Sequence, residues 1–238
     1  MTIKTIINIV SWITVIITIS LSIPQLIKLF KDKKTGKVNF ISFWIFHIGI
    51  LLWTCYGAVT KSRINDVQVD YHPFLNVIIA DGISLFINGL MMFLLYYYLP
   101  NVSRKTIIKA SVAIVATLII NVFLVWMWIF TKWRISENAS SIFALIAPAF
   151  TTFSFVPQLI TSIKSKNWKG VSPYMFLLYT LNNIVWIIFW ILNIYVAASA
   201  GASLIHWIIA LLWQIISLVI YSYQLWATIH YNKKPKNA

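Results

Sequence analysis

Charged residues are scarce in this sequence, and acidic ones are scarcer still. Only 10% of the 238 residues are charged, with five acids against nineteen Lys and Arg. An ordinary soluble domain carries about 25% charged residues. Because 60% of the chain is hydrophobic, a water-soluble fold would expose much of its apolar surface, which excludes a soluble enzyme. The cations cluster at the ends of apolar runs, as membrane flanks do, so we expect no nucleic-acid partner.

Cysteine is nearly absent as well. The single Cys55 excludes an internal disulfide and a multi-cysteine metal site. A hydrolase or a metal site would need a nucleophile with its base, or His and Asp ligands, at one depth. The four histidines are instead scattered along the chain: His47, His72, His206 and His230. We therefore predict no metal, no cofactor and no enzymatic activity.

The chain is rich in long apolar runs. A helix needs about 20 apolar residues to cross the hydrocarbon core. Seven segments meet that length: 5–30, 39–59, 73–99, 106–131, 139–163, 171–198 and 203–229. The sequence thus predicts a protein embedded in the lipid bilayer. A seven-helix receptor is a weaker interpretation, because the last segment has no lysine for a retinal Schiff base and no segment has a deep cation.

Lysine and arginine are divided unequally between the two sides of these spans. One side carries Lys4, Lys61, Arg63, Lys132 and Arg134, and the other carries the remaining fourteen. Cytoplasmic loops concentrate Lys and Arg. We therefore predict an outside amino terminus and a cytoplasmic carboxyl terminus, in the plasma membrane.

A duplication appears when the sequence is compared with itself at a fixed shift that aligns position 24 with position 157. The run Pro-Gln-Leu-Ile at 24–27 recurs at 157–160, and Trp53 pairs with Trp186. Each copy has three spans, so the fourth span gives both copies the same direction, which is a known transporter plan. We predict an all-α fold of two parallel three-helix repeats joined by a linker helix. The predicted domains are 1–99 for the first repeat, 100–138 for the linker and 139–238 for the second repeat with a short basic tail.

The repeated prolines predict a pair of hinges or gates. Pro24 and Pro157 lie about 9 Å from the cytoplasmic ends of their spans, at about 1.5 Å per residue. Each removes one helical hydrogen bond, and the freed carbonyl must find another donor in the membrane. Gln25 and Gln158 are candidate donors, while a static kink is the alternative interpretation.

A second set of repeated positions predicts a substrate site. Asp81 is the only formal charge deep in a span, where a carboxylate costs at least about 2.5 kcal/mol, and the repeat pairs it with Gln214. Trp53 and Trp186 lie near the same depth. Two polar groups and two indoles would form a cage in which aromatic faces meet a sugar ring or a cation. Asn183 is a further polar candidate. So are Asn182, His47, Asn76 and Asn88, for which hydrogen bonding between helices is equally expected.

The duplicated Pro-Gln pair in a three-plus-one-plus-three plan resembles the PQ-loop superfamily, whose best-known members are the SWEET sugar transporters. In SWEET proteins the third helix of each repeat carries an Asn that faces the sugar. The resemblance implies that Asp81 and Gln214 occupy those places, and that Trp53 and Trp186 lie near the family's pocket residues of the second helix. Cystinosin-like branches couple transport to protons through an intramembrane Asp, a role that would suit Asp81.

We therefore predict a facilitative carrier for a small polar solute, favouring a sugar, that alternates access between two three-helix bundles. The alternative is a proton-coupled carrier of an amino acid or another cationic solute, with Asp81 titrating. The expected partners are the solute and the lipid bilayer, and a homo-oligomer is compatible with the sequence.

Overall fold

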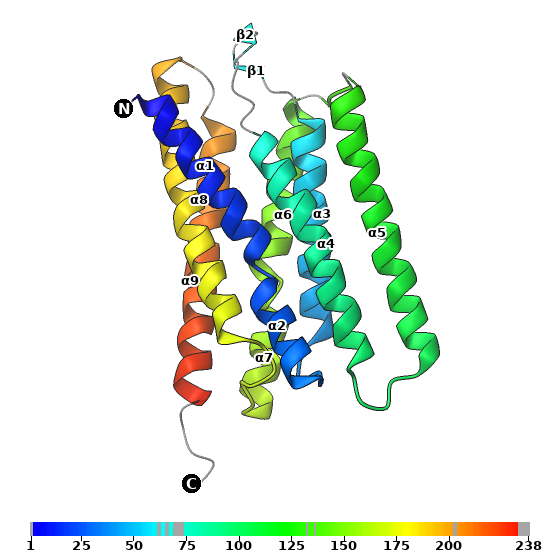
Figure 1. The fold of residues 1–238 in the computed structure, drawn as a ribbon. Coiled ribbons are helices and arrows are strands. Elements are labelled where there is room, and N and C mark those ends of the chain that lie inside the picture. Colours follow the sequence, from blue (N-terminus) through cyan, green and yellow to red (C-terminus); the bar gives the residue numbers. More distant parts are fainter. Residues whose placement is uncertain are drawn as a thin grey trace.

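The computed structural model is a bundle of long helices that run nearly the whole height of the molecule (Figure 1). It describes residues 2–60, 63–64, 67–68, 74–131, 133–135, 137–201 and 204–232. Within these residues seven spans are long and apolar enough to cross a membrane, so the seven-span prediction is confirmed. The small exception to the all-helical fold is an antiparallel pairing of two-residue strands between the second and third spans.

The helices are α1 (Ile3–Ser20), α2 (Ile23–Asp32), α3 (Phe40–Val59), α4 (Leu75–Tyr97), α5 (Arg104–Phe130), α6 (Glu137–Phe153), α7 (Val156–Ser165), α8 (Pro173–Ser199) and α9 (Ile205–Asn232). The strands are β1 (Arg63–Ile64) and β2 (Val67–Gln68). The first repeat is built from α1 to α4 and the second from α6 to α9. The linker span is α5.

The first and fifth spans each consist of two helices, where the sequence suggested one kinked helix. Pro24 and Pro157 lie in the first turn of α2 and α7. Proline suits that position because the amide that it lacks would have no helical partner there. Each short helix then ends at a lysine in the left-handed conformation, Lys33 with φ 47° and Lys166 with φ 48°. The repeat pairs these two lysines with each other, so the duplication extends to the backbone.

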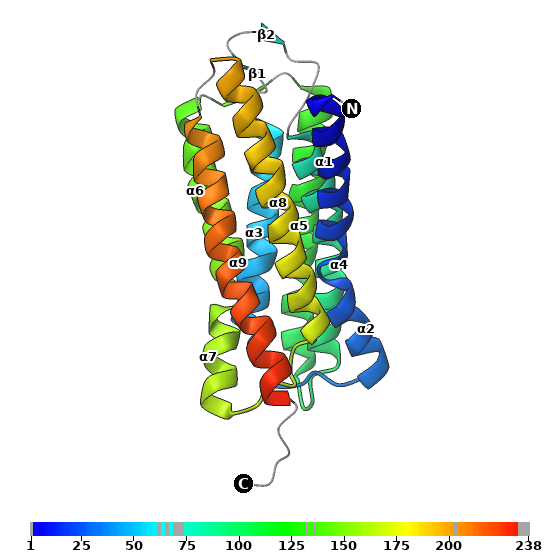
Figure 2. The ribbon, with the colours of Figure 1, turned by 90° about the vertical axis from the view of Figure 1, so that its left-hand side faces the viewer.

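Within each repeat the third span packs beside the first, and the second span packs beside the third. Thus α4 contacts both α1 and α3, and α9 contacts both α6 and α8. The repeats meet through α1 against α8 and through α3 against α6, which are equivalent pairs. Figure 2 shows α2 and α7 on opposite sides of the bundle, as such a pseudo-symmetric arrangement requires.

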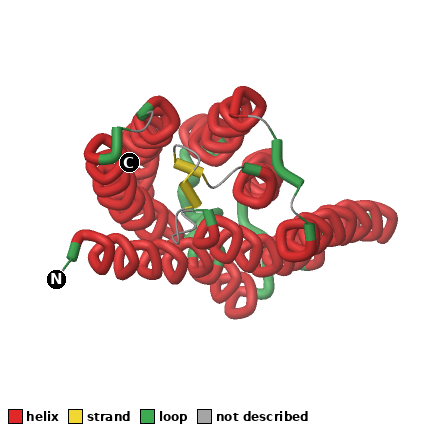
Figure 3. The backbone as a smooth tube through the Cα atoms, turned by 90° about the horizontal axis from the view of Figure 1, so that it is seen from above, coloured by secondary structure: helices red, strands yellow, loops and turns green. Residues whose placement is uncertain are grey.

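The linker helix α5 lies outside the pairing of the two repeats. It packs against α3 and α4, and it forms the right-hand edge of the molecule in Figures 1 and 3. Most of its surface is exposed: only Ala110, Ile114, Thr117, Asn121 and Leu124 are buried. An exposed apolar helix at the edge of the bundle suits contact with lipid, and it leaves the interface between the repeats to the other six spans.

The two ends of the bundle differ in charge. The end at which α9 finishes, at the bottom of Figure 1, carries the cations of α2, of α7 and of the first turns of α5; we call it the basic end. The opposite, N-terminal end carries the start of α1. Of the cations used in the orientation prediction, Lys61, Lys132, Lys233, Lys234 and Lys236 lie outside the described residues.

Candidate functional site

A cavity of about 60 Å³ lies between the two repeats. One water needs roughly 10–15 Å³ by this measure, so the space would hold roughly four to six waters, or one small polar solute in their place. Six spans contribute to it, and α5 does not. Its lining residues are Thr18, Leu21, Phe46, Ile50, Trp53, Val77, Asp81, Ser84, Pro148, Thr151, Thr152, Tyr179, Asn182, Asn183, Trp186, Trp190, Gln214, Ser217 and Tyr221.

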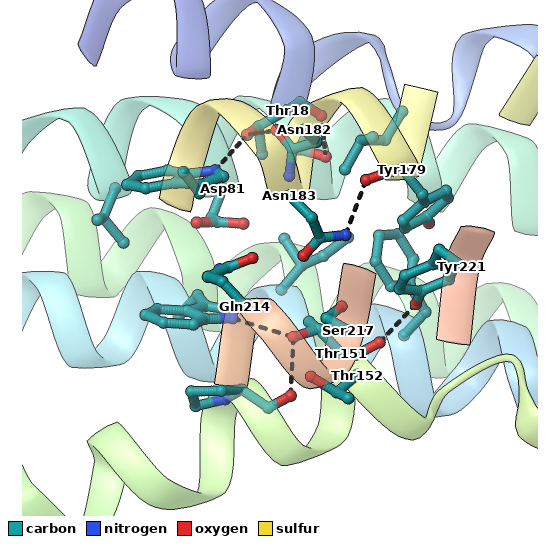
Figure 4. A pocket seen from close by; sticks show the side chains of 18 of the residues that line it. Thr18, Asp81, Thr151, Thr152, Tyr179, Asn182, Asn183, Gln214, Ser217 and Tyr221 are labelled. Carbon is teal, nitrogen blue, oxygen red and sulfur yellow. Dashed lines mark hydrogen bonds between the residues drawn. The ribbon is translucent and has the colours of Figure 1, made fainter. Parts of the chain in front are cut away.

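The five residues predicted to bind substrate all line this cavity. Asp81 is 7% exposed, Asn183 is 4% exposed, and the indoles of Trp53 and Trp186 are buried. Gln214 is half-buried. Figure 4 shows Asp81, Asn183 and Gln214 turned toward the same space. The residues that the repeat singled out in the sequence therefore lie around one cavity. Their role in binding a solute stays a prediction.

Each indole is hydrogen-bonded to a threonine of the other repeat. The Trp53 indole donates to Thr151 Oγ1 at 3.2 Å, and the Trp186 indole donates to Thr18 Oγ1 at 3.3 Å. Thr18 donates in turn to Asn182 Oδ1 at 2.9 Å. The two threonines occupy equivalent positions, so the repeat could have indicated them, but sequence reasoning missed both. These crossed bonds fix the ring faces that border the cavity.

The polar side chains of the cavity differ in how many of their atoms already have a hydrogen-bond partner within the protein. The Asn183 amide nitrogen donates to the Tyr179 carbonyl at 2.7 Å, and Figure 4 shows its oxygen turned the other way, toward the cavity. The Asp81 carboxylate has no hydrogen-bond or ion-pair partner among the described residues, and neither does the Gln214 amide. Both groups are therefore free to contact a bound solute.

An aromatic layer lies on the N-terminal side of the cavity. Phe74 and Trp207, which the repeat pairs with each other, lie parallel with ring centroids 6.5 Å apart and planes 3° apart. Tyr56 packs on Phe74, and Trp190 packs on Trp207. The rings form an unbroken series that starts and ends at the cavity indoles: Trp53, Tyr56, Phe74, Trp207, Trp190 and Trp186. The stacked pair therefore joins equivalent residues of the two halves on this side of the cavity.

The backbone itself closes the structure at the basic end. A Cβ on Gly36 would lie 3.2 Å from the Gly170 Cα, and a Cβ on Gly170 would overlap the Lys37 carbonyl oxygen. Only residues without a side chain allow two backbones to approach so closely. The loop before α3 and the loop before α8 therefore touch directly.

Gln25 and Gln158 hold these loops together across the repeats. Gln25 Oε1 accepts from the Ser172 amide at 2.8 Å, and Gln158 Oε1 accepts from the Asn39 amide at 2.5 Å. The side-chain nitrogens donate to Gly170 O at 3.5 Å and Lys37 O at 3.4 Å. The expectation that each Gln would serve the carbonyl freed by its own proline was wrong, because the amide reaches the opposite repeat. We call the two glutamines and their four bonds the Gln clasp.

Of the other polar candidates, Asn182 lines the cavity, whereas His47, Asn76 and Asn88 do not. His47 is buried and bonds to Asn88 at 2.9 Å and to Thr117 of α5 at 2.7 Å, and Asn88 accepts from Ser22 at 3.0 Å. This network joins α3, α4 and α5 to the residue that precedes α2, so hydrogen bonding between helices accounts for both residues. His72 and the side chain of His206 lie outside the described residues. Among the side chains that are described, no three His, Cys, Asp or Glu come close enough to hold a metal ion.

The crossed indole bonds can be tested with Thr18→Val, which keeps the shape of the side chain and removes its hydroxyl. The change leaves the Trp186 indole and the Asn182 oxygen without that partner. Leaving a buried polar group unpaired costs about 1–3 kcal/mol, so we expect the free energy of unfolding to fall by about that amount and solute affinity to fall with it. Thermal unfolding and ligand binding would measure the two effects.

Thr54→Val is the matched control for this test. Thr54 is fully buried and bonds only within its own helix, to the Ile50 carbonyl at 3.3 Å. Removing its hydroxyl breaks no contact between the repeats, so we expect a smaller change in stability and no change in affinity. Equal effects of Thr18→Val and Thr54→Val would show that the crossed bond has no special importance.

These features define a membrane protein of seven helical spans, in which two like-oriented repeats enclose a polar cavity. A family profile described as "PQ loop repeat" matches residues 6–66 and 139–199, which together make up just over half of the chain. The chain therefore belongs to the PQ-loop repeat family.

One curated protein and one solved structure are similar to this chain. The chain is 39% identical over 49 residues to the sugar transporter SemiSWEET of Escherichia coli (strain UMEA 3162-1). That match covers 21% of this chain and 55% of the relative, so it spans about half of the relative's length. A solved structure of a eukaryotic SWEET transporter superposes with a TM-score of 0.56 at 14% identity, covering 96% of this chain and all of that one. At this identity the superposition establishes the fold alone.

Proposed function

We propose that this chain is a membrane transporter that moves a small polar solute of the sugar class by facilitated alternating access. The observation that carries the proposal is a cavity with polar side chains between the two repeats, with contacts between the repeats on both sides of it. The stacked aromatic layer lies on one side, and the Gln clasp with its glycine contact lies on the other, so in this proposal they act as the two gates. The named activity of the SemiSWEET relative supports a sugar as the solute.

In this proposal the protein opens by bending at the helix breaks beside Pro24 and Pro157. Each break lies between the part of its span that borders the cavity and the short helix that carries the clasp glutamine. Bending at the two breaks would separate α2 from α8 and α7 from α3, opening the cavity toward the basic end. The aromatic layer would stay closed during that movement.

The charge of the two ends supports an orientation for the transporter. The described cations at the basic end include those of α2 and α7 beside the clasp. Cytoplasmic loops concentrate Lys and Arg. We propose that the basic end faces the cytoplasm, with the start of α1 outside, and that the repeats extend over 1–99 and 139–238 with a linker of 100–138 between them.

A proton-coupled carrier is the second candidate, and the unpaired Asp81 carboxylate favours it. A charge at this depth is costly, so its neutralisation by a proton could accompany each transport cycle. Transport that is the same at mildly acidic and neutral pH, and that persists when the proton gradient is collapsed, would exclude this candidate.

The proposal is tested by counterflow of radiolabelled sugars in proteoliposomes that contain the purified full-length chain. We expect saturable exchange that needs no gradient, with competition among sugars of similar size. A Trp53→Ala, Trp186→Ala double variant provides the negative comparison, because it removes both ring faces and is expected to lose exchange. If wild-type protein exchanges no sugar while amino acids are exchanged, the substrate class proposed here is wrong.

A further inference from the structure

We infer that the preferred substrate is an amine-bearing sugar, whose ammonium group pairs with Asp81 while its hydroxyls bind the amides of the second repeat. The inference rests on the proposed function and narrows its substrate class. It follows from the charge, the asymmetry and the hydrogen-bonding capacity of the cavity.

The first argument concerns charge. Among the described residues that line the cavity, Asp81 alone has a side chain that takes a negative charge near neutral pH, and no cation lies among them to pair with it. Asp81 is only 7% exposed, with no ion-pair partner in the described chain. Beside a neutral sugar an ionised carboxylate would stay uncompensated in a low-dielectric site, so such a sugar would bind with Asp81 protonated. A cationic solute supplies the missing charge, and it forms the stronger, charge-assisted hydrogen bond.

The second argument concerns the difference between the two repeats. The register of the repeat pairs Asp81 with Gln214, Ile50 with Asn183, and Phe46 with Tyr179. The wall from the first repeat is therefore apolar apart from one carboxylate and the hydroxyls of Thr18 and Ser84. The wall from the second repeat carries the amides. Such a cavity fits a solute with a cation at one end and neutral hydroxyls at the other.

The third argument concerns which atoms are still free. The Asn183 nitrogen is already used by the Tyr179 carbonyl, and its oxygen faces the cavity (Figure 4). The Asn182 oxygen already accepts from Thr18, which leaves its nitrogen as a donor. Free acceptors at Asp81 and Asn183 match the donors of an ammonium and its neighbouring hydroxyl. The faces of Trp53 and Trp186 add attraction for both a sugar ring and a cation.

The test compares three sugars on the purified full-length chain at about pH 6, where a primary amine of this kind is protonated. Glucosamine carries the ammonium, glucose carries a hydroxyl in its place, and N-acetylglucosamine carries a neutral amide. We expect glucosamine to bind and exchange at least about tenfold better than either neutral sugar, which corresponds to one well-formed charge-assisted bond. The Asp81→Asn variant, which is isosteric and neutral, should bring that ratio close to one.

Gln214→Asn is the matched control, since it shortens the equivalent side chain without changing charge. It should weaken glucosamine and glucose together and leave their ratio as in wild type. Equal affinity of wild-type protein for glucosamine and glucose would overturn the inference while leaving a sugar transporter in place, and this comparison needs no variant to fold. A glucosamine preference that survives in Asp81→Asn would also overturn it. Failure of all three sugars to bind would instead refute the proposed function.

Discussion

Gly170→Ala is expected to prevent the basic end from closing and to abolish most transport. The added methyl would overlap the Lys37 carbonyl oxygen and lie 2.6 Å from the Lys37 carbonyl carbon. Both atoms belong to the backbone, so no side chain can rotate out of the way. Overpacking of this kind costs about 1–3 kcal/mol or more. Such a penalty falls on the closed form alone and shifts the equilibrium toward the open form about 5- to 150-fold.

The opening can be measured as a distance between two spin labels. The labels are attached to cysteines that replace Lys31 and Lys164, in a Cys55→Ser background. These lysines are exposed, lie on α2 and α7, and are equivalent in the repeat. We expect a longer distance in Gly170→Ala, with exchange reduced by at least about tenfold. An unchanged distance and normal exchange would contradict the assignment of this contact as a closure.

Two other glycines provide graded controls. Gly36→Ala places a Cβ 3.2 Å from the Gly170 Cα, a tight contact that a small shift can relieve, so its effect should be intermediate. Gly82→Ala lies in a helix and its Cβ would meet nothing closer than 3.8 Å, so closure should be unaffected. The three variants add the same methyl, and the order of their effects therefore follows the order of the contacts.

The sequence alone predicted the architecture because the physics behind it is local or periodic. Seven apolar runs of sufficient length predict seven spans, and an odd number of spans per repeat requires a linker for parallel halves. The same register predicted that Asp81, Gln214, Trp53 and Trp186 would share a depth, and the cavity contains all four. Depth along a helix can be counted from sequence because the rise per residue is constant.

What could not be predicted is which atoms pair across the repeats. Helices that are apolar all round show no strong face, so the sequence does not indicate that α1 meets α8 rather than its own neighbours. For that reason Thr18 and Thr151 were missed as partners of the indoles. For the same reason Gln25 was assigned to its own helix, although its bonds cross to Ser172 and Gly170.

The double variant Gln25→Leu, Gln158→Leu is the second change with a large expected effect. It is expected to open the basic end because it removes hydrogen bonds between the two repeats. It deletes the four bonds of the Gln clasp and leaves the amides of Asn39 and Ser172 without those partners. At about 1–3 kcal/mol for each group left unpaired, the closed form should lose at least about tenfold in population. The same spin-label pair should report a longer distance, as in Gly170→Ala, and exchange should fall.

Each single variant should show about half of the free-energy effect of the double variant, because the two glutamines share no bonding partner and independent sites act additively. Pro24→Ala separates this clasp from the proposed hinge. The variant keeps Gln25 and lets α1 continue into α2, so it should slow exchange without shifting the resting distance between the labels. If Pro24→Ala lengthens that distance as much as Gln25→Leu does, the proline break and the glutamine do not have separate roles. In that case the division of the motif into a hinge and a clasp is wrong.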